Sequence, residues 1–180
     1  LNISGVSTTV DITGGVDLLA VEGELSFTSG VTAIELSGSG AINRFGAGQS
    51  ASLANIRESG IANSVQIETG SDLVLKEVEI TGRLTLRVDT GIDDLAALSA
   101  GELTAGAINI AGSPADNEQF QFASSLRSTA NEIEIRHAQT IAFDGSITAE
   151  TNLTVADVAA AVAFNGSHTV LAGSGSPGDI

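Results

Sequence analysis

The chain has 180 residues, of which 22 are acidic and 7 are basic, and its formal net charge is −15 at pH 7. This length suits one domain with a sizeable core. The charge argues against nucleic acid and anionic membrane as partners, because both require surfaces rich in lysine and arginine. The hydrophobic fraction of 42% is typical of a folded protein and not of a disordered acidic tail.

The choice of residues indicates a narrow core. There are 21 glycines, 2 prolines and 6 phenylalanines, and Trp, Tyr, Met and Cys are absent. Small residues together with Ile, Leu and Val suit stacked aliphatic side chains. The absence of cysteine excludes disulfides, cysteine-ligated zinc and thiol nucleophiles. No apolar run approaches the length that a membrane-spanning helix needs, so we expect no membrane insertion by this segment.

The first quarter of the chain consists of short pairs of alternating apolar residues with glycines between them. Such a pattern predicts strands of three to five residues and no long helix. Residues 46–60 lose this regularity, and within them we expect residues 52–57 to form a loop or one short helical turn. The apolar pairs are Leu1/Ile3, Val10/Ile12, Leu19/Val21, Leu25/Phe27, Ile34/Leu36 and Ile42/Phe45.

From residue 61 onward the alternation becomes sharper. The pair Val65 and Ile67 returns one period later as Leu84 and Leu86. Residues 92–106 lose strict alternation, and they predict a small excursion or one turn of helix. The alternation resumes at Ile108 and Ile110, and a polar interruption follows at residues 112–118.

The segment from residue 131 to residue 173 contains one phrase twice. In the first half of the phrase, Ile133 and Ile135 return as Leu153 and Val155. The second half of the phrase also returns, and the distance along the chain between matching residues is one residue longer than in the first half. There Ile141, Phe143, Gly145 and Ser146 match Val162, Phe164, Gly166 and Ser167.

A fixed period of about 20 residues, with short alternating strands and glycine-containing turns, predicts a β-solenoid. We therefore expect an all-β fold in which residues 1–180 form a single parallel β-helix of about nine coils, each of about 19–21 residues. Phe120, Phe122, Phe143 and Phe164 are expected inside it. The alternative is an antiparallel β-sandwich, which also uses short alternating strands.

The candidate metal ligands are Asp89, Asp93 and Asp94. They surround a glycine turn and offer the oxygen ligands that Ca²⁺ prefers. Neither an EF-hand loop nor a Gly-Gly-x-Gly-x-Asp repeat is present. The sequence thus suggests a structural calcium ion as the one cofactor to test, and no other cofactor is expected.

A polysaccharide-cleaving site would require two carboxylates that flank the substrate. Besides the aspartates around residue 90, Asp116 and Glu118 form a second candidate pair, and Arg83 and Arg87 are the nearest basic residues. Aromatic platforms for sugar rings are scarce, since Trp and Tyr are absent. We therefore expect no catalytic residues and no enzymatic activity.

The repeated phrases resemble the β-strand repeats of filamentous-haemagglutinin-like and autotransporter-type adhesins, which are large exported bacterial proteins. The resemblance lies in the style of the repeat and covers about residues 61–171. It implies a right-handed parallel β-helix that is displayed at the bacterial surface. It transfers no binding residue to this chain.

The expected function is that of a structural or adhesive segment of an extracellular bacterial surface or secreted repeat protein. One alternative is a subunit of a self-assembling extracellular filament or surface layer, and a second is a polysaccharide-cleaving β-helix enzyme. The expected partners are other copies of the chain or flanking repeats, and a host or matrix glycan or protein. We interpret the chain as a fragment whose uncapped ends associate end to end, more strongly with salt or Ca²⁺.

Overall fold

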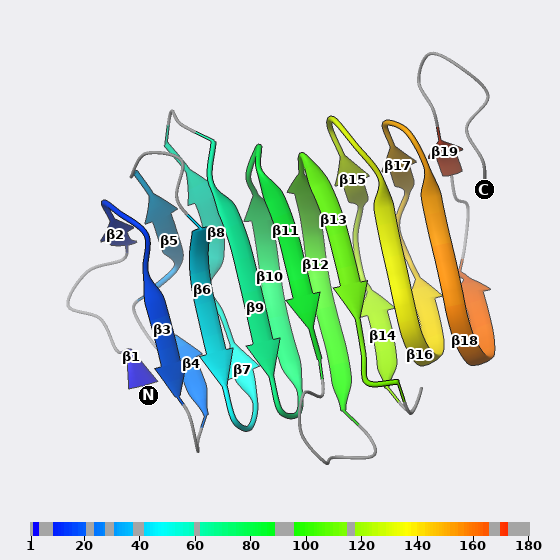
Figure 1. The fold of residues 1–180 in the computed structure, drawn as a ribbon, viewed down its shortest axis with the longest axis horizontal. Helices are drawn as coiled ribbons and strands as arrows, with labels where there is room; N and C mark the ends of the chain where they lie inside the picture. The colour runs from blue at the N-terminus through cyan, green and yellow to red at the C-terminus, as the bar shows by residue number, and fades with distance from the viewer. Residues whose placement is uncertain are drawn as a thin grey trace.

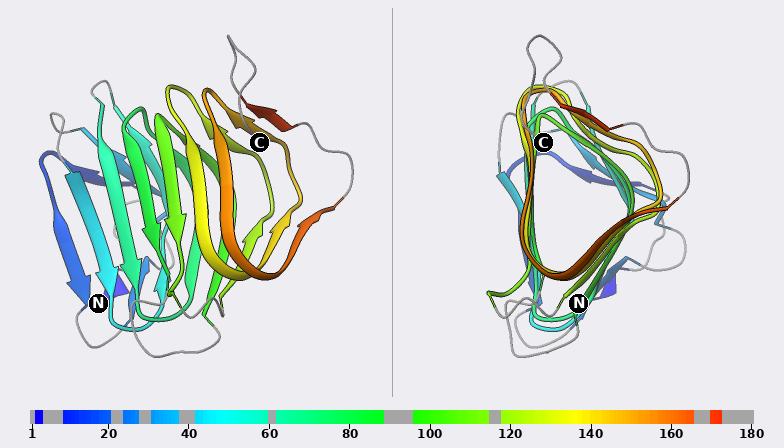
Figure 2. Two further views of the ribbon diagram at one scale, coloured as in Figure 1. Left: turned by 45° about the vertical axis from the view of Figure 1, so that its right-hand side comes forward. Right: turned by 90° about the vertical axis from the view of Figure 1, so that its right-hand side faces the viewer.

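The computed structural model describes residues 2–3, 9–20, 24–27, 31–37, 42–59, 62–88, 96–114, 118–165 and 170–172. These residues form strands that coil around one long axis with a triangular cross-section (Figures 1 and 2). Neighbouring strands of successive coils pair in parallel throughout the described residues. Examples are β5 (Ala33–Leu36) with β8 (Asn55–Glu58) and β16 (Ile133–Phe143) with β18 (Leu153–Phe164). The parallel β-helix is confirmed, and the antiparallel sandwich is wrong.

Three faces make up the solenoid, and the chain visits them in a fixed order. In the end view of Figure 2 the C-terminal coils face the viewer, and the chain runs counterclockwise as it approaches. The coil is therefore right-handed, which is the usual hand of crossovers between parallel strands.

Face 1 consists of β2 (Thr9–Ile12), β5 (Ala33–Leu36), β8 (Asn55–Glu58), the second halves of β10 (Leu73–Glu79) and β12 (Ala97–Ala105), β15 (Leu126–Ser128), β17 (Ile147–Ala149) and β19 (Val170–Ala172). Face 2 consists of β3 (Asp17–Ala20), β6 (Ile42–Ala47), β9 (Ser64–Thr69), β11 (Arg83–Arg87), β13 (Ala107–Ala111) and the first halves of β16 (Ile133–Phe143) and β18 (Leu153–Phe164). Face 3 consists of β1 (Asn2–Ile3), β4 (Leu25–Phe27), β7 (Ala51–Ser52), the first halves of β10 and β12, β14 (Gln119–Phe122) and the second halves of β16 and β18.

The coils are longer and fewer than predicted. The interval between paired residues is short where Leu84 pairs with Val65, and it is clearly longer where Ser52 pairs with Ser26. Within the described ranges the strands stack eight deep on faces 1 and 3 and seven deep on face 2, in place of the expected nine coils. The strands keep their register while the corner segments differ in length, and this variation explains why the predicted period was too short.

Two segments that looked irregular contain strands. Residues 46–60 include the end of β6 together with β7 and β8, so the expected loop or helical turn is wrong there. Residues 97–105 form β12, while residues 89–95 lie outside the described part of the chain. Both segments lack strict alternation because their strands contain small residues or bend at a corner.

The core is a set of stacked inward-facing residues. On face 3, Phe122, Phe143 and Phe164 occupy one register, and neighbouring rings stack with centroids 5.2 and 5.3 Å apart. Phe120, Phe122 and Phe143 are each 1% exposed, as predicted. Phe164 is 50% exposed, which corrects the prediction. It lies on the last described strand of this face, and its ring stacks on Phe143 of the preceding coil.

Glycine is required where two coils approach closely. Gly101 lies at the bend of β12 between faces 3 and 1, and a Cβ atom there would be 1.9 Å from the carbonyl oxygen of Lys76. No real Cβ atom tolerates that contact, and Lys76 contributes backbone, which cannot move without disturbing the register. Gly14, in contrast, has no atom within 4 Å of a Cβ position.

We predict that Gly101→Ala destabilises the solenoid by about 1–3 kcal/mol, because the added methyl group forces two coils apart. Gly14→Ala is the matched control and should change the free energy of unfolding by no more than about 0.5 kcal/mol. Urea unfolding followed by circular dichroism measures both. Equal stability of the two variants would contradict the close packing of coils at Gly101.

Candidate functional site

The predicted calcium ligands Asp89, Asp93 and Asp94 all lie outside the described residues. Within the described ranges, no group of three or more histidine or acidic side chains is arranged to hold a metal ion. The calcium site therefore stays a prediction from the sequence.

The second candidate pair of carboxylates does not form a surface site from the residues described. Asp116 falls in the undescribed segment 115–117. Glu118 is completely buried, and its Oε1 atom accepts a hydrogen bond of 2.8 Å from the backbone N–H of Ser113. A substrate on the surface does not reach a carboxylate in that position.

The predicted basic pair lies on face 2. Arg83 is 3.5 Å from a carboxylate oxygen of Glu132, and Arg87 is 3.9 Å from one of Glu68. Arg87 and Glu68 thus bridge neighbouring coils, whereas Arg83 reaches past the intervening coil of Ala107 to Glu132. Exposed pairs of this kind contribute little stability individually.

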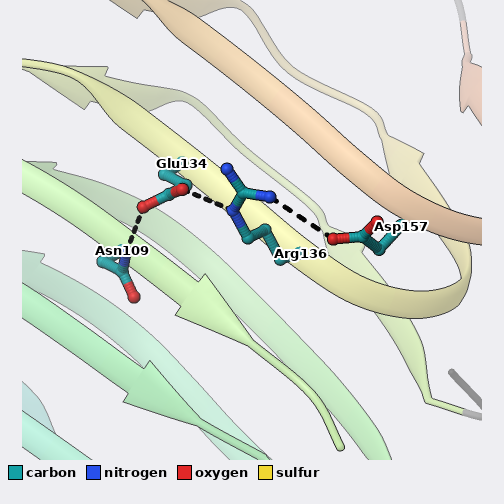
Figure 3. Close-up of polar contacts among 4 residues, drawn as sticks. All are labelled: Asn109, Glu134, Arg136 and Asp157. Atoms are coloured by element: carbon teal, nitrogen blue, oxygen red, sulfur yellow. Dashed lines mark hydrogen bonds and ion pairs between the residues drawn. The ribbon is translucent and has the colours of Figure 1, made fainter. Parts of the chain in front are cut away.

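Face 2 also contains a chain of polar contacts that crosses three coils (Figure 3). The amide Nδ2 of Asn109 donates a 2.6 Å hydrogen bond to Glu134, and Arg136 contacts Glu134 through Nε and Asp157 through Nη1, the latter at 3.3 Å. The hydrogen bond to Glu134 is the main cause that raises the pKa of Arg136, followed by the charge of Glu134. All four side chains are engaged with one another, so this network ties coils together.

Face 1 contains a groove that is open to solvent. It consists of two adjoining hollows of about 590 and 250 Å³ that share Glu79, Thr104 and Arg127. The larger volume falls within the usual range for small-ligand sites. The remaining lining residues are Arg57, Glu58, Ala62, Ile80, Thr81 and Thr129 in the larger hollow and Glu77, Val78 and Glu102 in the smaller one.

The floor of this groove is one row of outward-facing residues on face 1. Arg57 of β8 pairs with Glu79 of β10, Glu79 pairs with Thr104 of β12, and Thr104 pairs with Arg127 of β15. We call these four residues the face 1 row. Since parallel strands lie about 4.8 Å apart, the two arginines stand at the ends of a row about 14 Å long. Threonine is shorter than its neighbours, which leaves the hollow above β12.

One end of the row is fixed by an ion pair. Arg57 Nη2 is 2.9 Å from Glu77 Oε2, and Asn55 donates a 3.2 Å hydrogen bond to the same oxygen. The hydrogen bond from Arg57 to Glu77 is the main cause that raises the pKa of Arg57, and the charge of Glu79 adds a smaller increase. Arg57 is therefore held in place by protein groups.

The other end of the row is Arg127, whose guanidinium has no ion pair with a described residue. All seven Lys and Arg residues are described, and five of them form ion pairs; Arg127 and Lys76 form none with the described residues. The side chains of Thr81 and Thr104 likewise have no hydrogen-bond partner among the described residues. A planar guanidinium with free donors, next to free hydroxyl groups, is suited to bind an oxygen-rich ligand.

The sequence analysis did not identify the face 1 row. The interval between its members changes from coil to coil and exceeds the predicted period at every step, so a search at a fixed period does not align them. The sequence contains only an indirect signal for the row, which is the spacing of the apolar residues beside it. The inward neighbours Ile56, Val78, Leu103 and Leu126 follow the same spacing, so a register allowed to vary from coil to coil would have brought the row together.

Comparisons of the chain with protein-family models, with curated proteins and with solved structures give no match. The interpretation of the groove therefore depends on its own geometry and chemistry. In the described ranges, the chain contains no helix with the length and hydropathy needed to cross a membrane.

Proposed function

We propose that the chain is a structural and adhesive segment of an extracellular bacterial surface or secreted repeat protein, and that it catalyses no reaction. The observation that supports this most directly is the regular array of polar groups on a rigid support. On face 2, for example, Gln66, Thr85, Asn109, Glu134 and Thr154 share one register over five coils. Such a surface offers repeated polar contacts at the strand spacing of about 4.8 Å.

The core explains why this surface is rigid. Ile34, Ile56, Val78 and Leu103 follow one another on the inner side of face 1, and each is completely buried. The described strands of successive coils pair through their backbones, so the polar side chains outside are held at fixed intervals. The resemblance to exported adhesin repeats supports the proposed location outside the bacterial cell.

Beads coated with the chain test the adhesive function. We expect retention on at least one surface of a panel that carries matrix proteins, neutral glycans or acidic glycans. Beads coated with an unrelated folded protein of similar negative charge are the control, because they reveal retention by charge alone. Retention no greater than this control on every surface would contradict the adhesive function.

A filament subunit is a second candidate, favoured by the exposed edge of β18. Val162 and Phe164 are 40% and 50% exposed, whereas Ile141 and Phe143 in the same register one coil earlier are each 1% exposed. Among the described residues, no strand pairs with the outer side of β18. A strand at the edge of a sheet that exposes apolar side chains can pair with a strand from another copy.

Light scattering of the chain across a salt and calcium series tests this candidate. We expect association to increase with salt or Ca²⁺, because screening reduces the repulsion between copies of net charge −15. Phe164→Ser should reduce the association. Ile42→Ser, which removes a residue of similar exposure (53%) on face 2, should not. A monomer under all conditions would exclude end-to-end assembly.

A polysaccharide-cleaving enzyme is the third candidate, and the face 1 groove is the observation that favours it. Glu79, Glu102 and Arg127 line the same hollow, and two carboxylates beside a substrate are the minimum for glycoside hydrolysis. Incubation of the chain with acidic and neutral oligosaccharides, followed by chromatography, measures cleavage. We expect none. Turnover that disappears in Glu102→Gln would replace the non-enzymatic proposal.

A further inference from the structure

In the part of the chain that the structure describes, the face 1 groove combines one cation without an ion pair, Arg127, with several hydrogen-bond acceptors. Arg127 lines both hollows and has no ion pair, although Glu79 and Glu102 line the smaller hollow with it. Thr104 is its neighbour on the adjacent strand. The groove thus offers a guanidinium fork, the hydroxyl group of Thr104 and the carboxylates of Glu79 and Glu102, none of which has a hydrogen bond to another described side chain.

The balance of charge limits what such a groove can bind. Glu58, Glu77, Glu79 and Glu102 contribute four negative charges and Arg57 and Arg127 two positive ones, so the lining has a net charge of −2. A polyanion is repelled by this lining and by the net charge of the whole chain. A ligand with a single anionic group on an otherwise neutral body avoids most of that repulsion.

The neutral part of the ligand must supply hydrogen-bond donors. Glu79 and Glu102 accept hydrogen bonds when ionised, and threonine hydroxyl groups both donate and accept. Sugar hydroxyl groups are donors and acceptors of the matching kind. A sugar that also has one carboxylate satisfies the guanidinium of Arg127, because arginine binds carboxylates in a bidentate manner.

We propose that the face 1 groove binds a glycan through one carboxylated sugar unit of the uronic acid class. The carboxylate accepts hydrogen bonds from the guanidinium of Arg127. The hydroxyl groups of that sugar or of its neighbour donate to Glu79 and Glu102 and contact Thr104. This inference rests on the proposed adhesive function and names the ligand class of one face.

The probe is a disaccharide of glucuronic acid and xylose, which has one carboxylate, and its methyl ester is the neutral counterpart. Each is titrated into the ¹⁵N-labelled full chain, and amide chemical shifts are followed by NMR. We expect shifts at β10, β12 and β15 with the acid, which weaken as salt is added, and none with the ester at the same concentration. Equal responses to acid and ester would overturn the role of the carboxylate.

Two substitutions of equal charge change test the role of Arg127. Arg127→Gln should weaken binding by at least about tenfold, since a hydrogen bond to a charged group is lost. Arg87→Gln, on face 2, should leave the affinity within about twofold. Thr104→Val, which keeps the shape of the side chain and removes the hydroxyl group, should weaken binding a few-fold. The same loss in Arg87→Gln as in Arg127→Gln would overturn the proposed site.

The disaccharide experiment tests the groove proposal and the bead experiment tests the adhesive function, so either hypothesis can be contradicted without the other. If the beads are retained on some surface but the disaccharide produces no shifts on face 1, the groove proposal is overturned and the adhesive function stands. Circular dichroism and urea unfolding of each variant check that it is folded. The three substitutions are at outward-facing positions, so the solenoid should keep its stability.

Discussion

The backbone pairing between coils is the interaction on which the rest of the structure depends. Each strand inside the stack exchanges hydrogen bonds with its counterpart one coil before and one coil after, in parallel and in register, as between β10, β12 and β15. A coil by itself has too little apolar surface to fold. Pairing stacks the inward residues into continuous rows, and those rows bury the apolar surface that a single coil lacks.

The backbone conformation at the corners keeps the strands of successive coils in register. At the corner between faces 2 and 3, Gly112 donates to the carbonyl oxygens of Arg136 and His137 in the next coil. His137 and Asp157 occupy equivalent positions of β16 and β18, with φ values of 56° and 55°. This left-handed conformation is unusual for residues other than glycine. Here it lets one long strand turn from one face to the next while the pairing continues on both sides of the corner.

The same register produces both the network on face 2 and the groove on face 1. Where long side chains of opposite charge meet on adjacent coils, as with Arg136 and Asp157, the surface is tied together. Where a short residue stands between long ones, as Thr104 does between Glu79 and Arg127, a hollow remains. The surface chemistry of a solenoid therefore depends on which residues the pairing aligns, and these lie a full coil apart in the chain.

The sequence by itself determined the fold class and part of the register. The alternation of Phe120 and Phe122 and their return as Ile141 and Phe143 was sufficient to predict parallel stacking, because inward residues repeat whenever coils have equal length. The order of the faces and the length of the irregular coils required the tertiary structure. The groove did too: Glu79, Thr104 and Arg127 are separated by unequal intervals, and only the hydrogen bonds between coils decide which residues become neighbours.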